Sequence, residues 1–125
     1  MSESERLYAL RGAASVEENT AEAILSATEA LMRELIERND LSIDQFVSCL
    51  FTATNDLNAE FPALAARRIG FERVPLLCAR EIEVPGALQR VIRVLAHYYA
   101  PSDHVARHVY LGEARSLRAD LDAAQ

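Results

Sequence analysis

The chain has 125 residues and a net charge of −6; half of its residues are hydrophobic, and all 13 basic residues are arginines. This length and hydrophobic content favour one packed domain over residues 1–125 and exclude a disordered chain. Because phosphate-binding surfaces need excess positive charge, the acidic balance argues against a nucleic-acid partner. No apolar stretch approaches the roughly 18 residues of a membrane span, so we predict no membrane segment.

Two further features bear on the compartment. The N-terminal segment, residues 1–6, lacks the basic and apolar regions of an export signal. Cys49 and Cys78 lie far apart in the sequence and form neither a CxxC motif nor a disulfide framework. We therefore expect a cytoplasmic protein.

The N-terminal third predicts one strand and one long helix. Residues 7–14 have the pattern of a short strand that ends in a Gly-Ala-Ala segment. Asn19 and Glu22 have the spacing of a helix N-cap and its capping-box partner. Apolar residues then recur at helical spacing, which predicts a helix that ends near Asn39.

The middle of the chain predicts two strands around a short helix. Residues 46–54 are rich in Phe, Val, Leu and Thr, a composition that favours a strand. Pro62 suits the first turn of a short helix over residues 62–69, and Gly70 suits its end. Residues 74–79 predict a third strand.

The C-terminal part predicts two more strands, at residues 91–99 and 107–117, after a turn at Pro85-Gly86. The expected architecture is α+β: a mixed five-stranded sheet with one long and one short helix. So little helix leaves one face of the sheet uncovered, and exposed apolar faces are normally buried in an oligomer. We therefore expect a homo-oligomer.

Arg93 is the most informative single residue, because it lies within a run, residues 91–95, that is otherwise typical of a buried strand. A guanidinium is rarely buried without a partner. Either an internal carboxylate, from Glu81 or Glu83, neutralises Arg93, or an anionic ligand does so when it binds. The residues alone leave both alternatives open.

Motifs of the common enzyme classes are absent from the sequence. It contains no GxGxxG, no Walker phosphate loop, no HExxH and no GxSxG. The three histidines, His97, His104 and His108, show no metal-ligand pairing with cysteine, so we expect no metal site. A nucleophilic hydrolase is equally unexpected.

Short motifs in a fixed order run through nearly the whole chain, with one small gap before Gly70. They are Leu10-Arg11-Gly12-Ala13 with Val16-Glu17, Ala53-Thr54-x-Asp56-Leu57-x-Ala59-x-Phe61-Pro62-Ala63, Val74-Pro75-x-x-Cys78-x-x-Glu81-x-x-Val84, Ile92-Arg93-Val94, Arg107-His108-Val109-Tyr110-Leu111 and Leu117-Arg118-x-Asp120-Leu121. Together they resemble the monofunctional, trimeric α/β class of chorismate mutases.

The resemblance implies a homotrimer, a trimeric pseudo-α/β barrel with an active site in each cleft between subunits. It also implies an isomerase of aromatic amino-acid biosynthesis, in the shikimate pathway, that converts chorismate to prephenate by a Claisen ([3,3]-sigmatropic) rearrangement without a cofactor. Such a site holds the folded dicarboxylate and places positive charge beside the ether oxygen as the C–O bond breaks. Arginine suits both tasks because it stays charged and binds carboxylates through a planar fork.

Three residues correspond to catalytic positions of the family. Arg93 corresponds to the arginine that faces the ether oxygen and a substrate carboxylate. Arg11 corresponds to an arginine that binds a carboxylate, although a strand-end arginine is more often a solvated surface group. Glu81 corresponds to the carboxylate that accepts a hydrogen bond from the ring hydroxyl; its alternative is an exposed loop glutamate.

Six further residues correspond to substrate-binding positions: Tyr110, Cys78, Phe61, Arg67, Leu117 and Arg118. Tyr110 corresponds to a phenol that reaches a substrate carboxylate, Cys78 to a pocket-lining contact near the hydroxyl, and Phe61 to an apolar wall from the neighbouring subunit. Arg67 corresponds to a mobile arginine at the pocket entrance. Leu117 and Arg118 correspond to a C-terminal segment that folds over the site. Without the resemblance, an isolated cysteine or a strand tyrosine is more often a packing residue.

The sequence departs from the family pattern at Leu64, Leu77 and Ala119, where other members can carry a lysine, a small hydroxyl residue and a proline. These departures concern substrate capture more than chemistry.

Two functions of other kinds fit a small-carboxylate site. One is a non-enzymatic trimeric module that binds a small carboxylate, and the other is a deaminase-like trimeric enzyme. Glu81, Tyr110 and Cys78 at the family spacing favour the mutase over both, because carboxylate binding alone does not require the residues that face the hydroxyl.

Overall fold

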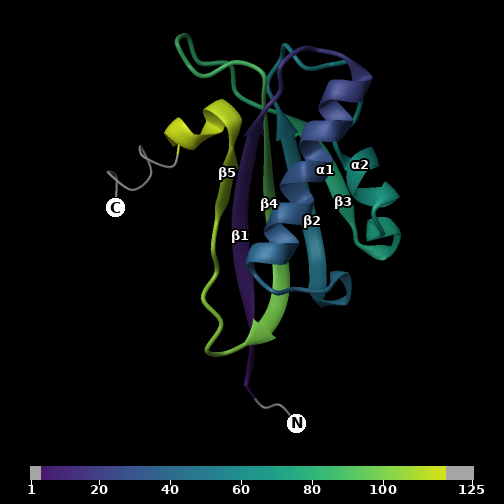
Figure 1. Ribbon diagram of the computed structural model, residues 1–125, viewed down its shortest axis with the longest axis vertical. Coiled ribbons are helices and arrows are strands. Elements are labelled where there is room, and N and C mark those ends of the chain that lie inside the picture. Colours follow the sequence, from purple (N-terminus) through teal and green to yellow (C-terminus); the bar gives the residue numbers. More distant parts are fainter. Residues whose placement is uncertain (1–3, 118–125) are drawn as a thin grey trace.

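The computed structural model describes residues 4–117 and contains one five-stranded sheet in the order β3-β2-β4-β1-β5 (Figure 1). The elements in chain order are β1 (Glu5–Ser15), α1 (Ala21–Arg38), β2 (Phe46–Ala53), α2 (Ala63–Arg68), β3 (Leu76–Arg80), β4 (Val91–Pro101) and β5 (Val109–Leu111). The first four strands and both helices begin and end within two residues of the predicted bounds. Neither helix of the described part combines the length and apolar character needed to cross a membrane.

The sheet is mixed, as predicted. Strand β4 runs antiparallel to both of its neighbours, β1 and β2. The two outer strands are parallel to the strands beside them, β3 to β2 and β5 to β1. The long strand β4 is the central strand of the sheet, and Arg93 on it is paired with Ala13 of β1 and Thr52 of β2.

The N-cap of the long helix α1 lies one residue later than predicted. Thr20 is the N-cap, and its hydroxyl accepts a hydrogen bond from the Ala23 amide at 3.1 Å. The predicted capping box of Asn19 with Glu22 is therefore wrong. Asn19 instead accepts hydrogen bonds from the amides of the Asn58 loop, at 3.0 Å for Asn58 itself. Thr and Asn are both good N-caps, and the distant loop decides between these adjacent residues.

Helices α1 and α2 cover one face of the sheet (Figure 1), and the hydrophobic core lies between them and the sheet. On β4 every second side chain, including Val94 and Tyr98, is buried on this face. Gly12 on β1 allows α1 to approach closely, because a Cβ there would lie 3.1 Å from Val94 Cγ1 and 3.2 Å from Leu31 Cδ1. Any larger residue at Gly12 would therefore push the helix away from the sheet.

The opposite face of the sheet is largely uncovered in the single chain, except where the turn after β5 packs on it. From Arg93 onward, the alternate residues of β4, including Tyr99, are partly or fully exposed, whereas those on the helix face are buried. Val91, at the start of the strand, is buried against Tyr110 and Ala114. Large apolar side chains are exposed along this face on the neighbouring strands as well, at Leu7, Leu50 and Leu77. The uncovered apolar face agrees with the expectation from the small amount of helix; the oligomer that would bury it stays a prediction.

The fifth strand is much shorter than predicted. A strand over residues 107–117 is wrong, because β5 covers only Val109–Leu111. Gly112 follows with a φ of +64°, which turns the chain out of the extended conformation into a short helical turn. The Glu113 amide then donates to the Ser15 hydroxyl at 2.9 Å, which fastens this turn to the end of β1.

Candidate active site

A cavity of about 460 Å³ lies on the uncovered face of the sheet. Four of the residues predicted to form the site line it: Arg11, Arg93, Tyr110 and Leu117. Its remaining wall is largely apolar and includes Leu50 and Leu95. The structure therefore brings together side chains from β1, β4, β5 and the turn that follows β5.

The strand register explains why these side chains meet. Ala13 on β1 is paired with Arg93 on one side and with Tyr110 on the other, so the three share one face of the sheet. Arg11 precedes Ala13 by two residues and lies on the same face. The small side chain of Ala13 leaves room between the guanidinium and the phenol. The cavity thus follows from strand pairing around one small residue.

Arg93 forms an ion pair with Glu81, with 3.1 Å between Nε and Oε2. Of the two internal carboxylates considered above, Glu81 is therefore the partner, whereas Glu83 accepts a hydrogen bond from the Asn55 amide group. The Arg93 side chain is 39% exposed, because it lies on the uncovered face rather than in the core. An internal carboxylate and an anionic ligand are thus compatible partners for the same guanidinium.

Glu81 lies just beyond β3, and both its backbone and its side chain are held in place. Its amide donates to the Ala53 carbonyl at 3.1 Å, and its Oε2 accepts from the Thr52 hydroxyl at 2.7 Å. Glu81 does not line the Arg11 cavity. It lines an adjoining cavity of about 580 Å³ beneath residues 82–89, and Arg93 borders both cavities.

Arg11 adds a second positive charge to the 460 Å³ cavity. Its backbone amide donates to His108 Nδ1 at 2.9 Å, which ties β1 to the segment before β5. Within residues 4–117 the arginines in ion pairs are Arg33, Arg38 and Arg93, so no carboxylate of this part compensates the Arg11 guanidinium. Two guanidinium groups at one cavity make it locally positive on an acidic chain, which suits a small dicarboxylate.

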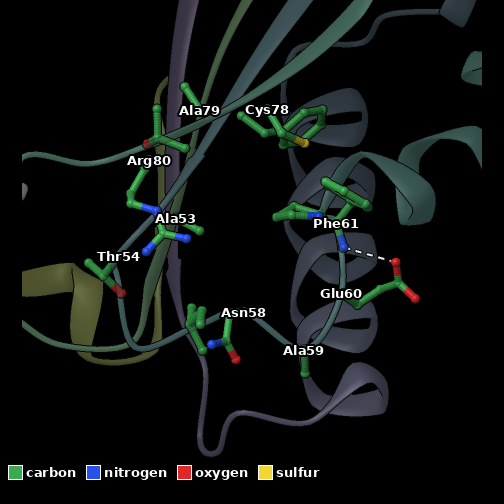
Figure 2. A pocket seen from close by; sticks show the side chains of 13 residues that line it. Ala53, Thr54, Asn58, Ala59, Glu60, Phe61, Cys78, Ala79 and Arg80 are labelled. Atoms are coloured by element: carbon green, nitrogen blue, oxygen red, sulfur yellow. Dashed lines mark hydrogen bonds between the residues drawn. The ribbon is translucent and has the colours of Figure 1, made fainter.

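Cys78 and Phe61 lie elsewhere in the single chain. They line a separate pocket of about 420 Å³ beside β2 and β3, shown in Figure 2 together with Asn58 and Arg80. Cys78 is paired with Phe51, which is buried on the helix face, so it lies on the face opposite to Arg93. Phe61 is 68% exposed. The structure therefore divides the predicted site residues into two sets on one chain.

The remaining predicted residues contribute to neither set. Arg67 is exposed on α2 and lines none of the cavities described above. Arg118 lies outside the described residues, as does Ala119. Of the other departures from the family pattern, Leu64 is partly buried on α2, and Leu77 is exposed on the uncovered face.

Thr52 is a polar residue of this region that was not predicted from the sequence. It lines both the 460 Å³ cavity and the Cys78 pocket, and its hydroxyl donates a hydrogen bond to Glu81. Its hydroxyl group within the predicted strand 46–54 was visible in the sequence. The face of the sheet on which this hydroxyl lies depends on the pairing of β2 with β4, which the sequence does not show.

The described part of the chain contains no candidate metal site. No cluster of three or more His, Cys, Asp or Glu side chains there could hold a metal ion. The histidine rings have other partners: His104 Nε2 lies 2.7 Å from the Tyr98 hydroxyl, and His97 Nδ1 lies 3.3 Å from the Ser48 hydroxyl. Burial raises the pKa of Tyr98 to about 12, so this phenol stays protonated as it bonds to His104.

The two free thiols differ in their surroundings, and this predicts different reactivity. Cys49 is buried, and burial raises the pKa of its thiol to about 12. Because the thiolate is the nucleophile, we expect one thiol per folded chain, Cys78, to react with Ellman's reagent at about pH 8. Denaturant should expose the second thiol. Reaction of the folded Cys78→Ser variant at the rate of the unfolded chain would contradict this assignment.

Comparisons with known proteins identify the family of the chain. The family model for chorismate mutase type I matches residues 7–121. The chain is 54% identical over 119 residues to the chorismate mutase AroH of Thermus thermophilus, covering 93% of this chain and 97% of that protein. It is 42% identical over 115 residues to the chorismate mutase AroH of Bacillus subtilis, covering 90% of each.

A solved structure has the same fold. A chorismate mutase from Clostridium thermocellum superimposes with a TM-score of 0.81 at 42% sequence identity, covering 87% of this chain and 98% of that one. The family match extends over nearly all of the described strands and helices, including those that carry Arg11, Arg93 and Tyr110. The chain therefore belongs to the chorismate mutase type I family.

Proposed function

We propose that the cavity lined by Arg11 and Arg93 is one half of the site at which chorismate is converted to prephenate. As a chorismate mutase, the protein is an isomerase. One observation carries the proposal for the site: two guanidinium groups face one cavity, and one of them has no carboxylate partner within the described residues. A small dicarboxylate supplies the missing negative charge.

The chemistry needs no covalent step from the protein. As the C–O bond breaks and the C–C bond forms, negative charge grows on the ether oxygen, and the fixed guanidinium of Arg93 stabilises it. Arg11 and Tyr110 bind substrate carboxylates and hold the folded conformer, which removes part of the orientational cost. The Glu81 carboxylate accepts a hydrogen bond from the ring hydroxyl of the substrate. These roles require neither a cofactor nor a metal ion.

The other half of the site comes from a neighbouring subunit in a homotrimer, with the three chains forming a pseudo-α/β barrel. Two observations support this assembly: the apolar face exposed at Leu7, Leu50 and Leu77, and the position of Phe61 and Cys78 in a pocket separate from the Arg11 cavity. A cleft between subunits would bury that apolar face and bring a second chain's residues to the Arg11 cavity.

Three residues complete the substrate contacts in this proposal. Arg67, exposed on α2, acts at the entrance of the cleft. Leu117 already borders the cavity, and with Arg118 it begins the segment that covers bound substrate.

The reaction belongs to aromatic amino-acid biosynthesis, in the shikimate pathway. We assign it to the cytoplasm, because the chain's two cysteines, Cys49 and Cys78, are both free thiols, as in a reducing compartment. The whole chain acts as one catalytic domain.

The test is turnover of chorismate by the purified protein, with product acidified and measured as phenylpyruvate. Arg11→Ala should lower kcat/KM by about thirtyfold, mainly through KM, as expected for loss of a charge-assisted hydrogen bond. Arg33→Ala is the matched control, because Arg33 pairs with Glu29 on the exposed side of α1 and should leave kcat/KM unchanged. A folded protein without turnover would favour the carboxylate-binding module instead.

A further inference from the structure

The contact between Arg93 and Glu81 is not a hydrogen bond. Arg93 Nε is buried and lies 3.1 Å from Glu81 Oε2, yet it has no acceptor with hydrogen-bond geometry in the described part of the chain. Attraction between the two charges is only weakly directional, so this contact alone leaves the carboxylate free to rotate. Another group must fix its orientation.

Thr52 provides that second contact. Its hydroxyl donates to Glu81 Oε2 at 2.7 Å, the same oxygen that lies beside Arg93. On the sheet, Thr52 is paired with Arg93 on β4 and with Ala79 on β3, two residues before Glu81. Thr52 therefore lies between the strand that carries the guanidinium and the strand that leads to the carboxylate.

We propose that Thr52 is a positioning residue for the rearrangement and acts through Glu81 and Arg93; this inference rests on the proposed roles of those two residues. By holding Oε2, the hydroxyl leaves Oε1 directed away for the ring hydroxyl of the substrate. It also keeps the carboxylate from turning both oxygens toward the guanidinium. That two-oxygen fork is the preferred geometry of arginine–carboxylate pairs, and it would occupy donors that the substrate needs.

The first measurement is the steady-state kinetics of Thr52→Val, which keeps the branched shape and removes the hydroxyl. We expect kcat/KM to fall by about tenfold, as for loss of a hydrogen bond to a charged group, with most of the loss in kcat. Thr52→Ser restores the hydroxyl and should recover most of the activity. Ser48→Ala is the matched control, because Ser48 lies on the same face of β2 beside His97 and should leave kcat/KM unchanged.

A double-mutant cycle with Glu81→Ala separates positioning from a structural role. If Thr52 acts through Glu81, Thr52→Val should have almost no further effect in the Glu81→Ala background. Equal effects of Thr52→Val in both backgrounds would overturn the proposal, as would a lower unfolding temperature with unchanged kcat/KM. Full activity of Glu81→Ala would instead remove Glu81 from the site, and Thr52 with it, while chorismate turnover by the unmodified protein would still stand.

Discussion

Arg93→Ala should reduce kcat by about a thousandfold and change KM far less, because the lost charge acts on the ether oxygen only as the C–O bond breaks. The structure supports a large effect for a second reason. Arg93 borders both the Arg11 cavity and the cavity that Glu81 lines, so its removal also leaves the Glu81 carboxylate without its cation. The measurement is the initial rate of chorismate consumption by the purified variant.

Arg93→Lys tests whether charge alone is sufficient. Lysine retains the charge but concentrates it at one point on a flexible stem, whereas the planar fork can face Glu81 and the substrate together. We therefore expect kcat to remain at least about a hundredfold below that of the unmodified protein. Arg38→Ala, which removes an exposed arginine that pairs with Glu34, is the control for a nonspecific effect of charge. A loss below about tenfold in Arg93→Ala would remove this residue from the chemical step.

Much of the fold could be predicted from local patterns, and the misses have identifiable causes. Alternation along β4 and helical periodicity along α1 are local properties, and both elements lie where they were expected. The N-cap depends on a partner 39 residues away, because Asn58 engages Asn19 and leaves the cap to Thr20. The last strand ends early because Gly112 adopts a positive φ, which the apolar pattern around it does not reveal.

The site also has features that could be predicted from the sequence and features that depend on how the strands pair. The family resemblance predicted Arg11, Arg93 and Tyr110 as site residues, and the register of β1 with its neighbours brings all three to one cavity. Spacing did not reveal that Cys78 points to the opposite face, because the direction of a side chain depends on which strand it is paired with. The role of Thr52 also depends on this pairing, which is a property of the folded sheet rather than of any segment.

Mixing two inactive variants should restore activity if each site is shared between chains. Arg93→Ala damages the cavity of the uncovered face, and Phe61→Asp places a charge in the pocket that also contains Cys78. In a closed trimer with one type of interface, random mixing gives about a quarter of the sites an intact half from each chain. Homotrimers of either variant have no intact site, whereas every mixed trimer has one, so we expect isolated mixed trimers to show about a third of the activity of the unmodified protein.

The control for this experiment pairs two defects in the same half. Arg93→Ala mixed with Arg11→Ala should give no recovery, because both side chains line one cavity of one chain and every site then retains one defect. Differently tagged chains, unfolded together, refolded and isolated as mixed trimers, allow both mixtures to be assayed alike. Recovery in the control mixture, or none with Phe61→Asp, would contradict a site shared in this way. The division of Phe61 from Arg93 on the single chain would then have to reflect a site completed by movement within one subunit.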